Sequence, residues 1–184
     1  KVLARYKYNR RREIKQSLSS GASYRESQSD KEVNEVYSIL KSLYKERVKL
    51  PMPSYEYFLE FMQSGLMKVF VVVHEDKIIG GAFCAILQGK GIFTYYYCGQ
   101  RDYNPRIFPT HLAVHAAIEY GINNGFIYLD FMGAGKAETE YGVRKYKLEF
   151  GGDLLAWGRY TYVLNPILFK FGKVGLAIIR GVKK

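Results

Sequence analysis

Three consecutive strand-like segments constrain the fold of this 184-residue chain more than any other feature. They occupy 68–74, 78–88 and 92–98, are rich in β-branched and aromatic residues, and are separated only by the turn sequences EDK and GKG. Connections this short join antiparallel neighbours, because a parallel crossover needs a dozen or more residues. The sequence therefore predicts an antiparallel meander at the centre of the fold.

Helical patterns flank the meander on both sides. Before it, the sequence predicts a basic helix closed by Gly21, a short strand at 23–27, a helix opened by the capping box Ser29–Glu32, and a helix that starts at Ser54. After it come a helix at 110–125, a buried strand at 126–131, a glycine loop at 132–136, a helix at 140–150 and a strand at 153–164. A length of 184 residues predicts one domain, and a hydrophobic content of 48% predicts that it is folded and globular.

The net charge of +11 lies entirely at the two ends of the chain. Residues 1–15 hold seven basic side chains and one acidic one, and 166–184 hold five basic and no acidic side chains. We expect a basic helix or linker at 1–21, a domain at 22–165 and a basic amphipathic tail at 166–184. Such ends attract the phosphates of RNA, anionic lipid or a nucleotide-linked substrate, with Arg10, Arg11 and Arg12 as candidate phosphate-binding residues. The alternative is two solvated surface helices that keep the protein soluble.

Two short motifs lie after the predicted helix at 110–125. The first is YLDFMGAG, with Asp130, Phe131 and Gly133. The second follows the pattern GV-x-x-[FY]-K-x-x-FGG through Gly142, Val143, Tyr146, Lys147, Phe150, Gly151 and Gly152. These motifs resemble those of the Fem-type (FemAB-like) peptidoglycan aminoacyltransferases, which are built from two GNAT-like domains. The order of predicted elements is also that of the GNAT (acyl-CoA N-acyltransferase-like) fold, an α/β fold with a mixed, mostly antiparallel sheet flanked by helices.

This resemblance covers nearly the whole chain and implies the C-terminal domain of a longer protein, which would include a further N-terminal GNAT-like domain, or a single-domain relative. It implies transfer of an aminoacyl group from aminoacyl-tRNA to an amine of a peptidoglycan-precursor peptide, lipid-linked precursors included. No cofactor beyond the charged tRNA is implied. The expected location is the cytoplasm, including the inner face of the membrane with peripheral contact to it.

Lys147 is the candidate catalytic residue. It lies in the apolar stripe of Val143, Tyr146 and Phe150, where a sealed core would not accept an ammonium. The resemblance implies that the lysine lies in the substrate cleft and holds the charge of the transfer intermediate; the alternative is a lysine whose stem covers apolar surface. The further candidate substrate-binding residues are Tyr57, Tyr97, Arg144 and Tyr146.

Two other function classes stay open. One is an N-acyltransferase of the same fold that uses acyl-CoA or acyl carrier protein. Ordinary GNAT enzymes bind coenzyme A with a Q/R-x-x-G-x-G/A turn that leads into a helix N-terminus, whereas this chain has GQRDYNPRIFPTH there, with Pro105 and Pro109, which disfavours acyl-CoA. The other is a non-catalytic domain that binds RNA or lipid through its basic ends.

Metal and disulfide chemistry are not predicted. His111 and His115 have the i, i+4 spacing of metal ligands on a helix, but no glutamate follows His111 and no third ligand is evident. We therefore expect both histidines to pack within the helix bundle. Cys84 and Cys98 lie in strand-like runs and are interpreted as buried thiols of a reducing compartment.

Overall fold

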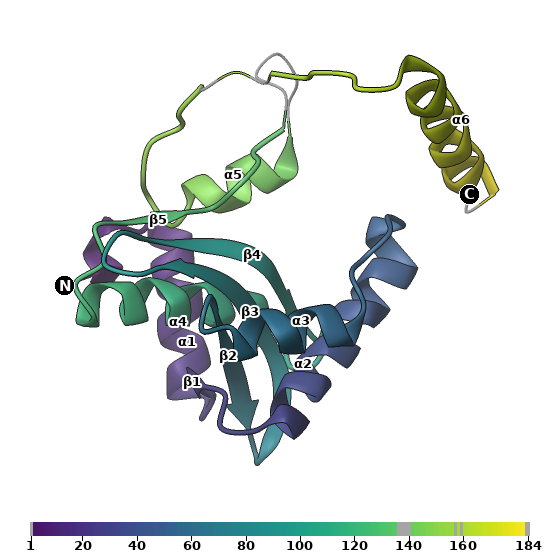
Figure 1. The fold of residues 1–184 in the computed structure, drawn as a ribbon. Coiled ribbons are helices and arrows are strands. Elements are labelled where there is room, and N and C mark those ends of the chain that lie inside the picture. The colour runs from purple at the N-terminus through teal and green to yellow at the C-terminus, as the bar shows by residue number, and fades with distance from the viewer. Residues whose placement is uncertain (1, 136–140, 157, 159, 183–184) are drawn as a thin grey trace.

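A five-stranded sheet forms the centre of the computed structural model, which describes residues 2–135, 141–156, 158 and 160–182 (Figure 1). Its strands lie in the order of the chain: β1 (Ser23–Glu26), β2 (Met67–His74), β3 (Lys77–Leu87), β4 (Gly91–Gly99) and β5 (Tyr128–Asp130). The first four are antiparallel to their neighbours, and β5 joins β4 in parallel. The predicted α/β fold with a mixed, mostly antiparallel sheet is confirmed, as is the meander.

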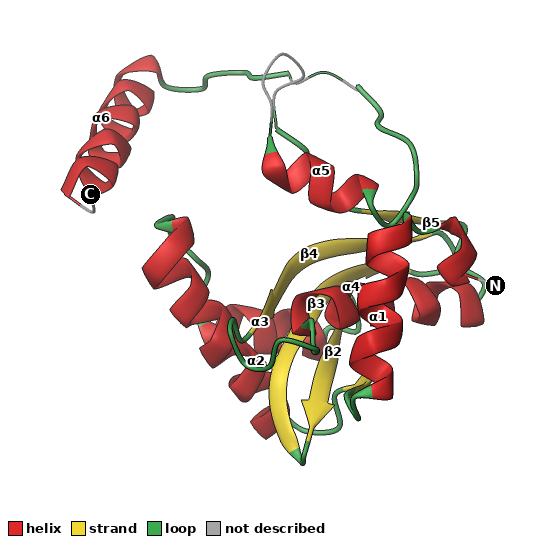
Figure 2. Ribbon diagram, turned by 180° about the vertical axis from the view of Figure 1, so that it is seen from behind, coloured by secondary structure: helices red, strands yellow, loops and turns green. Residues whose placement is uncertain are grey.

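Helices cover both faces of the sheet (Figure 2). The described helices are η1 (Val2–Arg5), α1 (Tyr8–Ser19), α2 (Asp30–Leu43), the π-helical turn η2 (Tyr44–Val48), α3 (Tyr55–Gln63), α4 (Pro109–Asn123), α5 (Gly142–Leu148) and α6 (Pro166–Val182), of which α6 stands away from the sheet. Strand β2 shows how the two cores form: Phe70 and Val72 face α1 and α4, whereas Val69 and Val71 face α2 and α3. A sheet buried on both faces explains why these strands are continuous apolar runs rather than alternating ones.

The predicted helix starts are confirmed by their caps. The Ser29 hydroxyl accepts the backbone N–H of Glu32 at 3.4 Å at the start of α2, and the Ser54 hydroxyl accepts that of Tyr57 at 3.4 Å at the start of α3. Gly21 follows α1 with a φ of +90°, a backbone conformation that favours glycine. Local hydrogen bonds thus fix where these helices begin and end.

The sheet splits between β4 and β5. The three residues of β5 pair only with Gly91, Ile92 and Phe93, at the beginning of β4. Beyond them, the remaining six residues of β4 have no partner strand on this side within the described part of the chain. Helix α5 and the loop that follows β5 lie next to this gap, as Figure 1 shows. Side chains from β4 and α5 can therefore meet there.

Two predicted strands differ from the structure. The described residues of 153–164 form no strand, and Tyr160, Tyr162 and Leu164 are exposed. A strand depends on hydrogen bonds to a neighbour, and this segment leads away from the sheet toward α6. The strand at 126–131 is reduced to β5, which lies at the sheet edge with Tyr128 44% exposed, so the prediction that it is buried is wrong.

Gly99 is required where β4 meets α4. A Cβ atom added at Gly99 would lie 2.6 Å from the backbone nitrogen of Thr110 and 2.8 Å from Cβ of Pro109. We expect Gly99→Ala to lower the free energy of unfolding by about 1–3 kcal/mol, because backbone must move to make room. Urea unfolding measures this effect. In the control Gly133→Ala, the added Cβ meets nothing within 4 Å, and an equal loss in both variants would contradict the packing argument.

Candidate functional site

Lys147 is buried and donates two hydrogen bonds to the loop that follows β5. Its side chain belongs to α5 and the residue is only 9% exposed. Nζ donates to the backbone oxygen of Phe131 at 2.5 Å and to that of Gly133 at 2.7 Å. Burial lowers the pKa of Lys147, and the Asp130 carboxylate opposes this shift. The lysine therefore faces a polar surface made of backbone carbonyls, not the apolar core.

Arg144 reinforces the contact between α5 and the same loop. Its Nε donates to the backbone oxygen of Ala134 at 3.0 Å. The loop also closes on itself, because the backbone N–H of Met132 donates to Oδ1 of Asp130 at 2.6 Å. Val143, which the sequence pattern placed in the same apolar stripe as Lys147, is 38% exposed and lies outside the core. Two cations of one helix thus hold the carbonyl-rich loop at the gap between β4 and β5.

Tyr97 and Tyr146 form an aromatic pair across this gap. The ring of Tyr97, from β4, stacks on that of Tyr146, from α5, with centroids 5.8 Å apart and an angle of 14° between the planes. The Tyr146 hydroxyl donates to the backbone oxygen of Thr110 at 3.2 Å. Burial raises the pKa of Tyr97 to about 12 and that of Tyr146 well above its usual range. Both phenols therefore remain protonated at neutral pH.

Tyr57 is separate from this pair. It lies on α3, is 40% exposed, and contacts Phe58 and Phe61 of its own helix. A hydrogen bond with Tyr95 raises its pKa to about 12. Because α3 covers the face opposite to α1 and α4, the structure places Tyr57 on the α2–α3 side of the sheet and Tyr97 on the other.

Arg10 is a core residue, so its prediction as a phosphate-binding residue is wrong. It is 2% exposed, and Nη2 donates to Oε2 of Glu149 at 2.7 Å. Its guanidinium lies 4.4 Å from the ring centre of Tyr146 and 4.6 Å from that of Phe150. Arg10 thereby links α1 to the helix that carries Lys147. The basic run in the sequence indicated a solvent-exposed helix and contained no signal for this burial.

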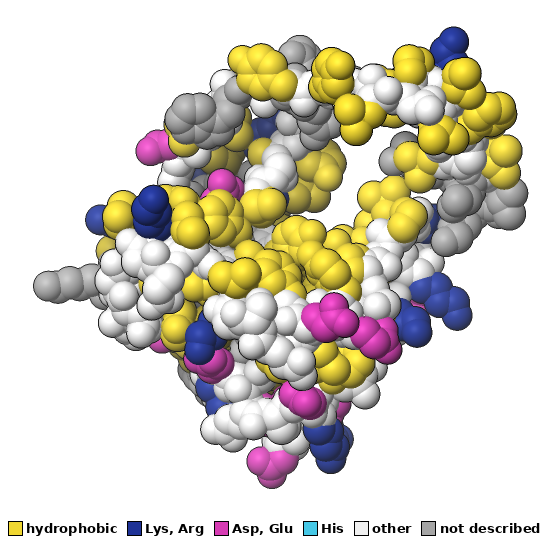
Figure 3. Space-filling model, in the orientation of Figure 1, with side chains coloured by type: hydrophobic (Ala, Val, Ile, Leu, Met, Phe, Trp, Pro, Cys, Tyr) yellow, Lys and Arg dark blue, Asp and Glu magenta, His cyan; other side chains and the backbone are white. Residues whose placement is uncertain are grey.

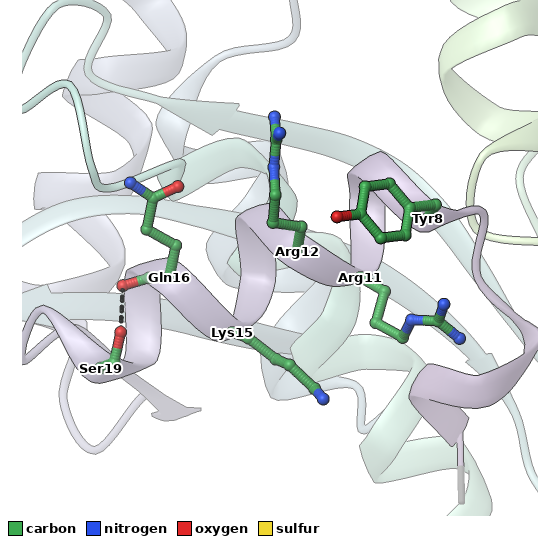
Figure 4. Close-up of a pocket in the computed structure, with 6 residues that line it drawn as sticks. All are labelled: Tyr8, Arg11, Arg12, Lys15, Gln16 and Ser19. Atoms are coloured by element: carbon green, nitrogen blue, oxygen red, sulfur yellow. Dashed lines mark hydrogen bonds between the residues drawn. The ribbon is translucent and has the colours of Figure 1, made fainter.

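Arg11 and Arg12 remain accessible on α1. Together with Tyr8, Lys15, Gln16 and Ser19 they line a shallow hollow of about 610 Å³. Figure 4 shows Arg11 and Lys15 extending to the same side of the helix and Arg12 to another. This cationic face could contact a polyanion, which stays a prediction.

The N-terminus of α4 offers few free N–H groups to an anion. Pro109, its first residue, has no N–H. Gly99 lies close to the N–H of Thr110, since a Cβ added to this glycine would lie 2.6 Å from that nitrogen. The next two N–H groups, of His111 and Leu112, both donate to the backbone oxygen of Phe108, at 3.0 and 3.1 Å. Two of the first three residues of α4 therefore offer no free N–H to an anion, which weakens the usual anion-binding property of a helix N-terminus.

His111 and His115 pack inside the bundle. The Tyr6 hydroxyl lies 2.9 Å from Nδ1 of His115, and the His111 ring stacks on Phe108 with centroids 5.2 Å apart. Nδ1 of His111 also lies 3.3 Å from Oε2 of Glu13. In the described part of the chain, no three His, Cys, Asp or Glu side chains are grouped to hold a metal ion. The structure therefore places both histidines as packing residues.

His111, whose side chain is only 16% exposed, is expected to make the fold acid-sensitive. Burial, with a smaller contribution from Arg10, lowers its pKa from 6.5 to about 3. Between these values the unfolded chain binds more protons than the folded one, so stability is full above pH 6.5 and falls as the pH drops toward 3. This imidazole alone gives a slope of up to about 1.4 kcal/mol per pH unit. We expect His111→Phe to reduce the difference in unfolding free energy between pH 7 and pH 5; an unchanged difference would contradict the assignment.

Comparison with known proteins identifies the family. The family model described as "Acetyltransferase (GNAT) domain" matches residues 4–148. No curated protein sequence matches the chain. Among solved structures, an aminoglycoside acetyltransferase from an uncultured soil metagenomic sample, in complex with trehalose, is 15% identical with a TM-score of 0.59 and covers 80% of this chain and 99% of its own.

Two further structures share the fold. FemX is 12% identical with a TM-score of 0.66, and the match covers 82% of this chain but only 55% of FemX. A ribosomal-protein-alanine N-acetyltransferase from Brucella melitensis biovar Abortus 2308 is 12% identical with a TM-score of 0.55 and covers 79% of this chain and 100% of its own. At these identities the structures show a shared fold, and the family model shows membership. The chain belongs to the GNAT acetyltransferase domain family and is an acyltransferase.

Proposed function

We propose that this domain transfers an aminoacyl group from aminoacyl-tRNA to an amine of a peptidoglycan-precursor peptide, as the Fem-type motifs imply. The small number of free N–H groups at the N-terminus of α4 is the observation that carries the proposal. Coenzyme A-dependent members of the fold bind the pyrophosphate at that helix, whereas here Pro109 has no N–H and the N–H of His111 already donates to the backbone oxygen of Phe108. A donor without that pyrophosphate fits this chain better.

The reaction needs little proton chemistry from the protein. The acceptor amine attacks the ester carbonyl of the charged tRNA, an amide bond forms, the ester bond breaks, and the terminal ribose hydroxyl of the tRNA leaves with a proton. Positioning supplies much of the catalysis when the amine is already nucleophilic. The remaining requirement is stabilisation of the oxyanion that forms on the carbonyl.

Lys147 is the proposed oxyanion donor. Two of the three protons on its ammonium are held by the carbonyls of Phe131 and Gly133, which fixes its orientation. The third N–H of the ammonium is the one proposed to donate a hydrogen bond to the oxyanion. Tyr97 and Tyr146, which stack beside α5, would form one wall of the acceptor site, with Arg144 holding the adjoining loop and Tyr57 contacting a more distant part of the acceptor.

The proposed partners follow from the positive charge on α1 and from the greater length of FemX. The cationic face of Arg11, Arg12 and Lys15 suits the tRNA backbone, whose binding would weaken steeply with salt. The match to 55% of FemX supports a further GNAT-like domain in the full protein, and the acceptor would bind between the two. Charged tRNA and precursor meet in the cytoplasm, which is the proposed location.

A second candidate is acyl transfer from acyl-CoA or acyl carrier protein. It is favoured by the description of the family model and by the names of two structurally similar acetyltransferases. One assay separates the candidates: the full-length protein is incubated with a pool of charged tRNA or with acetyl-CoA, each with and without cell-wall precursor. We expect precursor-dependent deacylation of tRNA and no thiol release from acetyl-CoA. Thiol release without tRNA deacylation would overturn the proposal.

A further inference from the structure

Helix α6 separates apolar and basic side chains onto opposite sides. At 100° per residue, Leu168, Phe171 and Ile178 fall on one side of Pro166–Val182, and Lys170 and Lys173 fall on the other. The segment 166–182 contains no acidic residue. The pattern is that of a helix lying between two media, one apolar and one aqueous.

The apolar side of α6 is exposed. Leu168 is 67% exposed, Phe171 70% and Ile178 59%. Figures 1 and 3 show the helix standing away from the sheet, with hydrophobic side chains gathered on it and on the segment that leads to it. Large adjoining apolar surfaces on a folded protein mark an interaction site. This side of α6 therefore calls for an apolar partner.

We propose that α6 binds the surface of an anionic lipid bilayer, lying in the plane of the interface. Its aromatic and aliphatic side chains would enter the boundary between headgroups and acyl chains, and its lysines would stay at the level of the lipid phosphates. The basic side identifies the partner by charge complementarity, since a net-positive helix without acids is attracted to anionic lipid and not to a neutral apolar groove. In the described part of the chain, no helix is long and apolar enough to cross a bilayer.

This inference is independent of the proposed aminoacyl transfer. It concerns a helix outside the GNAT match, which ends at residue 148. The same surface attachment would serve any acyltransferase whose acceptor is held at a membrane. Its failure would leave the assignment of Lys147 untouched, and failure of the tRNA assay would leave the lipid binding untouched.

Vesicle flotation of the full chain tests the proposal. The probes are vesicles of phosphatidylcholine with phosphatidylglycerol, and vesicles of phosphatidylcholine alone. We expect binding to the first that weakens with added salt, and little binding to the second. Lys170→Gln with Lys173→Gln is expected to lower the partition coefficient roughly 25-fold, since each lysine near an anionic surface contributes about fivefold. Phe171→Ser with Ile178→Ser is expected to lower it about tenfold or more.

A matched control removes the same charge elsewhere. Lys31→Gln with Lys41→Gln changes two exposed lysines of α2 and is expected to leave vesicle binding nearly unchanged. Equal losses in this control and in the α6 lysine variant would show that only net charge matters and would overturn the proposal. Vesicle binding unaffected by Phe171→Ser with Ile178→Ser would overturn it as well. If those serines instead convert a dimer to a monomer, the apolar side of α6 joins copies of the chain.

Discussion

Lys147→Ala is expected to lower kcat for aminoacyl transfer by about 10²–10³-fold, the usual effect of removing one oxyanion donor. The ammonium is held by two carbonyls and lies on the helix that carries Tyr146, so its position is fixed before substrate binds. A donor that acts on the oxyanion lowers kcat while KM stays nearly constant. Steady-state kinetics with charged tRNA measure both constants.

The same lysine also holds the loop after β5, and two controls separate the roles. Lys145→Ala removes an exposed lysine from the same helix and is expected to leave kcat unchanged. If Lys147 acted only by holding the two carbonyls, its removal would displace the loop and weaken substrate binding. A raised KM with kcat unchanged in Lys147→Ala would therefore assign Lys147 to positioning and contradict its role as oxyanion donor.

Arg10→Ala is expected to lower the free energy of unfolding by about 2–4 kcal/mol, the largest stability effect among these variants. The change deprives Glu149 of its cation and empties the space between α1 and the rings of Tyr146 and Phe150. Glu149 is 23% exposed at its side chain, so water compensates part of the loss. Urea unfolding followed by tyrosine fluorescence measures the change.

Arg12→Ala is the matched control for Arg10. Arg12 lies two residues further along α1 and is exposed, so we expect a change within about 0.5 kcal/mol. The two arginines should also differ in tRNA binding. We expect Arg12→Ala to weaken the binding of tRNA and to make that binding less dependent on salt concentration. Similar stability losses in both variants would contradict the burial of Arg10.

The sequence predicted elements whose signals are local. The turns EDK and GKG, the caps Ser29 and Ser54, and Gly21 each act within a few residues, and the structure confirms them. The inward position of Lys147 was also visible as a charge within an apolar stripe. The strand expected at 153–164 failed because strand propensity does not supply the neighbouring strand that a strand needs.

What the sequence alone determined is the order of the helices and of the central strands up to β5, together with the motifs that indicate the family. Only the tertiary structure decided which basic residue of α1 is buried, because that depends on how the helix is rotated against α5. Arg10 and Glu149 are 139 positions apart, and the Tyr97–Tyr146 stack also joins distant segments. Such pairs depend on packing of whole elements, so residue spacing along the chain does not reveal them.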